Sequence, residues 1–492
     1  MLYENLKAIA ARAPSSSGLR ANGVLHSYAD LAERAGRLGS GLRERGVQPG
    51  DAVAILLPNG PELFATAHAL FAIGAIAVPL SPLAPAAELA KMAGKAKVAA
   101  VVARRDLLAT AEHLAGEKKL PIFLDGDEGD HSLDVLAKTP LATLTPPTAD
   151  ARALYLFSSG STGIPKVVPH THAEMRANAK ATATDFGLRP DDVIFNNLPG
   201  NHAMGFYNSV FEVPEAAATT LYFSDPAPLL LARKRLMDTL VSERVTILPG
   251  VPFMFDMLAG ASDEFDLSAI RLTYSAGVAL RREIFDKVRE RFGFLIRQAY
   301  GCTEAAHVAF NRAEDPEPAW DSVGRPVGDT VVEVIPVENP LGPDYGELAF
   351  RSSSLTKGYL GEDKLNAAAF ATGRFMTGDL GRLDAEGNVY IKGRSKLIIE
   401  VAGHKVDPFE IEEVLLGHPA VAEVVVVGPP DPRTGEQRLK AVVVKSDDVA
   451  PDALIRYARE RLSPQKVPAL VEFRDAIPKS ATGKILRGKL LE

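Results

Sequence analysis

The chain has 492 residues, which exceeds the usual size of one domain and leaves room for roughly two to four. Apolar residues make up 46% and charged residues 24%. The net charge of −7 comes without any basic block, so nucleic acid is not an expected partner. The single cysteine, Cys302, excludes an intrachain disulfide and any zinc or iron–sulfur centre built on cysteines, and it fits a reducing cytoplasm.

The first residues, MLYENLKAIAARAP, include an acidic side chain and lack a long apolar core, so a secretory signal is not expected. The most apolar run, ALFAIGAIAVPL at 69–80, is too short to cross a bilayer and contains Pro79. It predicts a buried helix end followed by a buried strand. We therefore expect a cytoplasmic protein with no membrane span.

The N-terminal part alternates helical and extended patterns. Ser27 is predicted to cap a helix whose leucines recur on one face, and strand 51–58, helix 60–75 and strand 76–80 follow it. The strands are continuously apolar rather than alternating, which is typical of parallel sheets covered by helices. The acidic, Pro- and Thr-rich segment 125–150 is predicted to be a surface connection.

The pattern changes near Asp384. A short strand at 388–392, a helix at 409–417 and two valine-rich strands at 423–428 and 440–445 predict a small α+β unit over about the last hundred residues. The predicted fold class is α/β, with a large N-terminal domain of helix-covered, mostly parallel sheets and a small α+β C-terminal domain.

A glycine- and hydroxyl-rich stretch, LFSSGSTGIPKVV at 156–168, follows a short apolar strand. Its glycines can expose backbone N–H groups, its hydroxyls donate, and Lys166 adds charge, so it predicts a phosphate-binding loop, with an ordinary polar turn as the alternative. A nucleotide P-loop is ruled out, because Pro165 replaces the last glycine and Val167 replaces the hydroxyl that binds magnesium.

SSGSTGIPK resembles the phosphate-binding signature of the adenylate-forming superfamily, which includes acyl- and aryl-CoA synthetases, peptide-synthetase adenylation domains and firefly-type luciferases. Four further motifs follow in family order: YGCTE, TGDL, the pair GR, and PKSATGKILR near the end of the chain. The resemblance covers nearly the whole sequence, from the N-terminal helix pattern to Leu491. The resemblance implies use of ATP, Mg²⁺ and coenzyme A. It also implies an N-terminal adenylation domain at 1–395 with the acyl pocket, and a mobile C-terminal lid domain at 396–492 that pivots about Lys396.

The same resemblance assigns the site residues. The predicted catalytic residues are Lys484, the expected catalytic lysine, with Thr303 at the α-phosphate, Glu304 on Mg²⁺, and His202 on the substrate side. The remaining predicted cofactor-binding residues divide into the phosphate loop, the adenine and ribose contacts, and the pantetheine channel: Ser158, Ser159, Gly160, Ser161, Thr162, Gly163 and Lys166; Ala276, Gly277, Tyr300, Asp379 and Arg394; and Gly403.

The segment NNLPGNHAMGF at 196–206 resembles the family's substrate-side element, with His202 where amino-acid-activating domains usually carry an aspartate. A neutral imidazole cannot pair with an α-ammonium group, so amino acid substrates are disfavoured. The predicted pocket walls suggest an apolar or aromatic acid: His202, Phe206, Tyr207, Ala276, Gly277 and Ala299. No lone arginine stands out for a second carboxylate. His170 and His172 lack further ligands, so a metal site there is not expected.

Three functions remain open at this point. The favoured one is an acid–CoA ligase, supported by His202 and Gly403, with a small carboxylic acid and CoA as partners. The second is a stand-alone adenylating enzyme that loads the phosphopantetheine of a carrier protein. The third is an idle ATP-binding regulator, disfavoured because every catalytic position is filled. Leu397 and the AGH sequence at 402–404 depart from the family pattern and make thiol transfer less secure. Monomer and homodimer are both compatible with the sequence.

Overall fold

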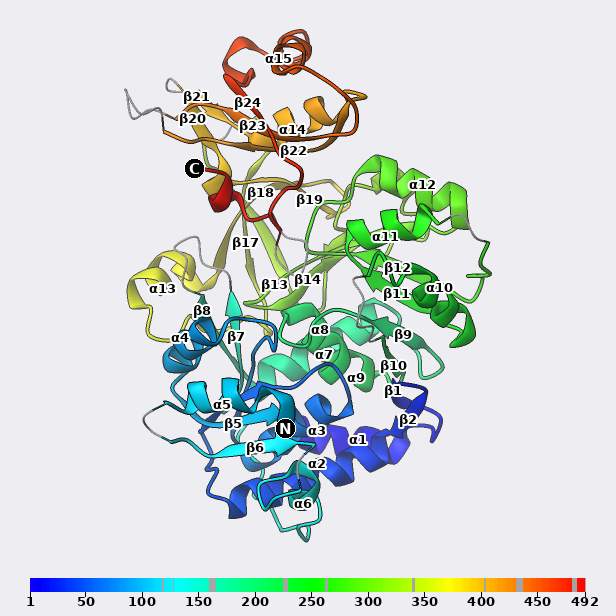
Figure 1. The fold of residues 1–492 in the computed structure, drawn as a ribbon, viewed down its shortest axis with the longest axis vertical. Coiled ribbons are helices and arrows are strands. Elements are labelled where there is room, and N and C mark those ends of the chain that lie inside the picture. Colours follow the sequence, from blue (N-terminus) through cyan, green and yellow to red (C-terminus); the bar gives the residue numbers. More distant parts are fainter. Residues whose placement is uncertain are drawn as a thin grey trace. The chain divides into compact units, whose positions relative to one another are not determined.

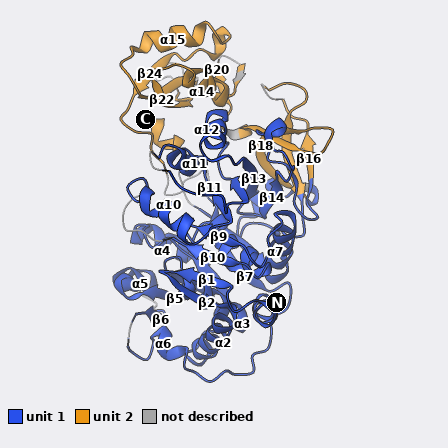
Figure 2. Cartoon of the chain, turned by 90° about the vertical axis from the view of Figure 1, so that its right-hand side faces the viewer, with its two compact units in different colours: residues 1–331, 351–373 blue, residues 332–350, 374–492 orange. Residues whose placement is uncertain are grey.

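The computed structural model describes residues 1–116, 119–126, 128–158, 165–223, 229–261, 264–338, 341–401, 404–430, 437–479 and 485–491. The chain divides into two compact units (Figure 2). Unit 1 combines Met1–Val331 with Arg351–Gly373, and unit 2 combines Val332–Phe350 with Arg374–Glu492.

A nine-stranded sheet forms one half of unit 1. Its central strands run parallel from β13 to β1, while β14, β15 and β2 add antiparallel edges. The order across the sheet is β15 (Arg325–Pro326), β14 (Ala306–Phe310), β13 (Ile296–Cys302), β12 (Leu272–Ser275), β11 (Ile247–Gly250), β9 (Val193–Asn196), β10 (Thr219–Tyr222), β1 (Gly18–Ala21) and β2 (Val24–Ser27).

A six-stranded sheet forms the other half. It is parallel except for its last pair, in which β7 and β8 are antiparallel. The order is β6 (Ile122–Asp125), β5 (Val98–Arg104), β3 (Ala52–Leu56), β4 (Ile76–Pro79), β7 (Arg152–Ser158) and β8 (Lys166–Thr171). The strands β3 and β4 are buried along their whole length, as their unbroken apolar sequences predict.

Helices cover both sheets (Figure 1). They do so because both sheets contribute apolar side chains to buried clusters on their faces. One core contains strand residues of both sheets together with Leu38 of α2 (Tyr28–Glu44) and Phe64 of α3 (Pro61–Ile73). Helices α10 (Arg233–Ser242), α11 (Pro252–Ala259) and α12 (Arg282–Phe292) cover the opposite face of the nine-stranded sheet, and α4 (Ala86–Ala96) and α5 (Leu108–Ala115) cover the opposite face of the six-stranded sheet. The remaining helices of unit 1 are α1 (Leu2–Arg12), α6 (Leu133–Leu136), α7 (His172–Asp185), α8 (Ala203–Tyr207), α9 (Val213–Glu215) and α13 (Asp363–Ala369).

The predicted elements of the N-terminal part are confirmed. The Ser27 side chain accepts a hydrogen bond from the Asp30 amide and caps α2. The 125–150 connection is not structureless, because Ser132 caps the short helix α6 within it. Over the described ranges, no helix combines the length and apolarity that crossing a bilayer requires.

Unit 2 is built from three small sheets. The first, in the order given, is β16 (Val331–Ile335), β17 (Gly346–Arg351), β18 (Phe375–Leu383) and β19 (Val389–Arg394). The second pairs β20 (Ile399–Val401) with β21 (His404–Val406), and the third is β22 (Val421–Val427), β23 (Lys440–Lys445) and β24 (Leu470–Phe473). Helices α14 (Pro408–Leu416) and α15 (Pro451–Arg459) contribute apolar side chains to one core with β22 and β23.

The α/β fold class, with a large domain of mostly parallel sheets and a small C-terminal domain, is confirmed. The compact units do not divide at the predicted 395/396 boundary, because nearly all of the β16–β19 sheet is counted with the C-terminal part. A division by packing need not coincide with a point of rotation, so the pivot at Lys396 stays a prediction.

Candidate active site

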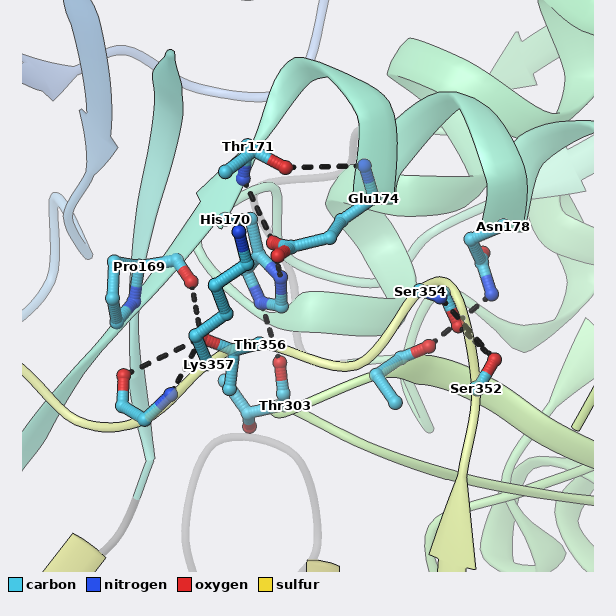
Figure 3. Close-up of polar contacts among 12 residues, drawn as sticks. Pro169, His170, Thr171, Glu174, Asn178, Thr303, Ser352, Ser354, Thr356 and Lys357 are labelled. Atoms are coloured by element: carbon cyan, nitrogen blue, oxygen red, sulfur yellow. Dashed lines mark hydrogen bonds and ion pairs between the residues drawn. The ribbon is translucent and has the colours of Figure 1, made fainter. Parts of the chain in front are cut away.

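The turn between β13 and β14 carries Thr303 and Glu304. Nε2 of His170 lies 2.8 Å from the Thr303 carbonyl oxygen (Figure 3). The Tyr207 hydroxyl donates to the same oxygen at 3.2 Å. The Asn178 side-chain amide donates to the carbonyl of Ala305, two residues after Thr303, at 3.2 Å. Burial lowers the pKa of His170 to about 4, so the imidazole is neutral at physiological pH. Three side chains from β8, α8 and α7 therefore fix the backbone of this turn.

A capping box directly follows His170 in the chain. The Thr171 hydroxyl accepts from the Glu174 amide at 3.2 Å, and the Glu174 carboxylate accepts from the Thr171 amide at 2.9 Å, which starts α7 at this point (Figure 3). The same carboxylate lies 3.8 Å from Nδ1 of His170. Strand β8 and helix α7 thus meet at a hydrogen-bonded corner, and His170 in this corner contacts the turn that carries Thr303 and Glu304.

The Glu304 carboxylate is buried beside Tyr359. The Tyr359 hydroxyl donates to Oε1 of Glu304 at 2.8 Å, and Nζ of Lys166 lies 4.7 Å from the centroid of the Tyr359 ring. Burial raises the pKa of Tyr359, and the charge of Glu304 adds to that rise, so the phenol remains a neutral donor. The structure therefore brings two of the predicted residues, Lys166 and Glu304, to one tyrosine.

This carboxylate suits magnesium. Mg²⁺ usually takes one or two carboxylates and completes its shell with water and substrate phosphates. Among the described residues, no group of three or more His, Cys, Asp or Glu side chains could hold a metal. Glu304 therefore fits an ion that is shared with a bound nucleotide, and it does not fit a metal held by protein alone.

The predicted phosphate loop leaves and re-enters the six-stranded sheet at one place. Its two ends, Ser158 and Lys166, are partners in the β7–β8 pair. Five of its predicted residues lie outside the described part of the chain: Ser159, Gly160, Ser161, Thr162 and Gly163.

The substrate-side residues divide between two cores. His202 precedes α8, and Gly205 is required there because a Cβ would lie 2.4 Å from the Pro199 carbonyl oxygen. Phe206 and Tyr207 belong to the core that contains residues of both sheets. Ala276 and Ala299 belong to a different cluster. Of the described α8 side chains, Met204 packs against this second cluster, and sequence reasoning did not identify it.

The two other predicted site residues of unit 1, Gly277 and Tyr300, are close in sequence to the residues of these clusters. Gly277 directly follows Ala276 and has φ +83°, and Tyr300 is half-buried near the end of β13. Sequence reasoning gave no role to Tyr359 and treated His170 only as an improbable metal ligand. Neither has a local signal, because their partners are 55 and 133 residues away in the chain.

In unit 2, the two residues predicted to bind ribose contact each other. Asp379 and Arg394 are partners in the β18–β19 pair, and Nε of Arg394 donates to the Asp379 carboxylate. The Asp379 amide donates to the Thr377 hydroxyl at 2.9 Å, and Gly378 adopts a left-handed φ of +73° that favours glycine. The TGD motif is therefore a tight turn within β18 that leaves the Asp379 carboxylate against Arg394 of the neighbouring strand.

Lys484 and Gly403 lie outside the described residues, and Lys396 falls in a short 3₁₀ turn, Ser395–Leu397. The described residues on either side of the Lys484 segment make defined contacts within unit 2. Lys479 forms a β-bridge with Ile485, and Arg487 donates to the Glu412 carboxylate at 2.7 and 3.1 Å and to the Val426 carbonyl at 2.6 Å.

Comparisons with known proteins agree with these features. Residues 6–360 match the family described as AMP-binding enzyme, and residues 410–484 match its C-terminal domain. A feruloyl-CoA synthase from an Amycolatopsis species is 31% identical over 97% of this chain and 96% of its own. An anthranilate CoA ligase in complex with anthranoyl-AMP superposes with a TM-score of 0.87 at 26% identity, covering 99% of this chain and 96% of that one. The o-succinylbenzoate CoA synthetase of Bacillus subtilis, in complex with ATP and magnesium ion, superposes with a TM-score of 0.86 at 26% identity and 99% coverage of both chains.

Proposed function

The chain belongs to the AMP-binding enzyme family within the adenylate-forming superfamily and is an AMP-forming acid–CoA ligase, and from this premise we propose that it activates an apolar or aromatic carboxylic acid. The acid carboxylate attacks the α-phosphate of ATP and releases pyrophosphate. The thiol of CoA then attacks the acyl carbon of the adenylate and releases AMP.

The observation that supports this proposal most is the buried turn at Thr303 and Glu304. During adenylation, the carboxylate of the acid must approach the negatively charged α-phosphate of ATP. Preorganised positive charge and hydrogen-bond donors therefore lower the activation barrier of this step. We expect the Thr303 hydroxyl and Lys166 to bind phosphate oxygens, while His170 and Tyr207 hold the turn in place. When Mg²⁺ is bound, it neutralises phosphate charge beside Glu304.

The residues of unit 2 complete the proposal. Lys484 is expected to bridge the acid carboxylate and the α-phosphate, and Asp379 with Arg394 is expected to bind the ribose hydroxyls. The C-terminal domain would then turn about Lys396 so that the Gly403 segment guides the pantetheine arm.

The proposed acid class rests on three residues. His202 occupies the sequence position at which amino-acid-activating enzymes of the family usually carry an aspartate for the α-ammonium group. Ala276 and Ala299 contribute small side chains to an apolar cluster. Amino acids are therefore expected to be poor substrates.

The test is acid-dependent ATP–pyrophosphate exchange over a panel of aromatic, aliphatic, dicarboxylic and amino acids, followed by product analysis with CoA and with a phosphopantetheinylated carrier protein. We expect exchange with apolar or aromatic acids and a CoA thioester as product. Transfer to the carrier protein alone would favour the loading enzyme, and absence of exchange with every acid would contradict the proposal.

A further inference from the structure

A buried acid–base pair lies outside the machinery described so far. Glu212 is 1% exposed and His307 is 5% exposed. Nε2 of His307 lies 3.4 Å from Oε2 of Glu212. Within the described residues, neither carboxylate oxygen of Glu212 and neither ring nitrogen of His307 makes a hydrogen bond of good geometry.

Such a pair needs an explanation, because burying polar atoms without hydrogen bonds is costly and native proteins rarely leave them unsatisfied. The neighbouring side chains that the structure describes are mostly aromatic. The Phe186 ring lies 4.9 Å from the His307 ring, and the Tyr274 ring lies 6.3 Å from it. Burial raises the pKa of Tyr274, and the negative charge of Glu212 adds to the rise. The Tyr274 hydroxyl is already engaged with the Asn208 side chain at 3.2 Å.

Along the chain, both members of this pair follow segments that carry predicted site residues. Glu212 ends the π-helical turn Asn208–Glu212, which directly follows α8. Single π turns inside helices often occur at functional sites. His307 follows the Thr303–Glu304 turn on β14, where a register shift sets it opposite Gly301.

The same face of the nine-stranded sheet carries the small residues of the predicted pocket. Tyr274, Ala276 and Ala299 belong to one cluster with Phe186, and His307 packs against two of its rings. A side chain larger than alanine at 276 or 299 would fill this face. An acid bound over these alanines would therefore extend toward His307 and Glu212.

We propose that Glu212 and His307 together bind a hydroxyl group on the acid, at a position remote from its carboxylate. This inference rests on the proposed function and specifies its substrate class. A hydroxyl is both a donor and an acceptor, so it can donate to Glu212 and accept from a protonated ring nitrogen of His307. The 3.4 Å separation of Nε2 and Oε2 lets one oxygen reach both atoms. An ammonium group could donate to Glu212 but could not accept from His307, and a methyl group could form neither hydrogen bond.

The test compares matched acids that differ by one hydroxyl: 4-hydroxybenzoate with benzoate, 4-hydroxycinnamate with cinnamate, and 6-hydroxyhexanoate with hexanoate. The readout is kcat/KM for ATP–pyrophosphate exchange. A site built to bind a hydroxyl rejects the analogue that lacks it, so we expect at least one pair to differ by about 100-fold or more in favour of the hydroxylated acid.

Two variants assign that preference to the pair. The double substitution Glu212→Leu with His307→Phe makes the surface apolar, a change that buried ion pairs often tolerate without loss of stability. The double variant should lower the ratio of kcat/KM for the hydroxylated acid to that for the plain acid to about 1 or below, because no unpaired polar atoms remain to disfavour the plain acid. The milder Glu212→Gln should lower kcat/KM for the hydroxylated acid by about 10-fold or more and leave the plain acid unchanged. Ser209→Ala, on the same π turn but bonded to the Gly205 carbonyl, is the control and should keep the wild-type ratio.

Three outcomes overturn the inference: equal use of hydroxylated and plain acids by the wild type, a wild-type ratio retained by a folded double variant, or the same loss for both acids in Glu212→Gln. In each of these, exchange with some acid persists and the proposed function stands. Absence of exchange with every acid contradicts the proposed function itself, and the inference falls with it.

Discussion

Tyr359 connects two residues that the sequence motifs treat separately. Its hydroxyl donates to Glu304, and its ring faces the ammonium group of Lys166. A lysine near an aromatic face is attracted to it, and a phenol donor steadies a carboxylate in one orientation. We interpret Tyr359 as a positioning residue that aligns Glu304, the carboxylate proposed to hold magnesium, with Lys166 at the end of the predicted phosphate loop.

Tyr359→Phe tests this interpretation, because it removes the hydroxyl and keeps the ring. A hydrogen bond to a charged group contributes about 1.5–3 kcal/mol, so we expect the Mg²⁺ concentration for half-maximal exchange to rise by about 10-fold or more. Binding of Mn²⁺ in the presence of ATP, followed by paramagnetic resonance, should weaken in parallel. Tyr457→Phe, which loses a hydroxyl bonded to the Gly417 carbonyl in unit 2, is the control. An unchanged metal affinity in Tyr359→Phe would contradict the role.

Lys484 carries the second prediction at this scale. Since its charge is expected to act on the anions of adenylation only, Lys484→Ala should slow ATP–pyrophosphate exchange by about 100-fold or more. Thioester formation from supplied acyl-adenylate should stay near the wild-type rate. Lys489→Ala, an exposed lysine nearby, should leave both half-reactions intact. Equal loss of both half-reactions in Lys484→Ala would rule out the assigned role.

At the scale of elements, the C-terminal segment depends on one buried ion pair. Arg487 binds the Glu412 carboxylate of α14 with two nitrogens and also reaches the Val426 carbonyl of β22. Burial raises the pKa of Glu412, while Arg487 opposes that rise. Arg487, the arginine of the final motif, therefore fastens the described residues after position 484 to α14 and β22.

Arg487→Met should destabilise the protein strongly, because it leaves a buried carboxylate without its partner. Breaking such a pair costs about 3–5 kcal/mol, whereas an exposed pair is worth about 0–1 kcal/mol. Arg461→Met, which breaks an exposed contact with Glu460, is the matched control. Urea denaturation of both variants measures the difference. Equal midpoints in the two variants would show that the Arg487 pair does not anchor the segment.

At the scale of the whole molecule, three buried histidines set a limit on acid stability. Burial lowers the pKa of His68 to about 3 and those of His170 and His172 to about 4. In the unfolded chain these groups titrate near 6.5. Between these values the unfolded state binds protons that the folded state does not, so the free energy of unfolding decreases as the pH falls from about 6.5 toward 4.

The melting temperature of the full chain should therefore fall steeply below about pH 6.5, with each histidine contributing about 1 kcal/mol by pH 5.5. His68→Gln should flatten this dependence, since glutamine can still donate to the Val210 carbonyl without binding a proton. His113→Gln, at an exposed position of α5, is the control. Identical pH profiles for His68→Gln and the wild type would contradict the assignment.

Much of this molecule follows from the sequence alone. Continuous apolar strands between capped helices predict covered parallel sheets, since local periodicity records which faces are buried. The five motifs likewise identify the family and the reaction, because each retains its residue types and their order. The short helix at 133–136 lay beyond this reasoning, since a single capped turn leaves too little periodicity to detect.

The tertiary structure decided what no local pattern contains. Tyr359 reaches Glu304 across 55 residues, His170 reaches Thr303 across 133, and His307 reaches Glu212 across 95. Side chains so far apart in the chain meet only through the arrangement of the strands that carry them. The sequence by itself determined the fold class and the chemistry, since both depend on local residue types. The partners of each buried polar group were decided only by the fold, because packing brings distant segments together.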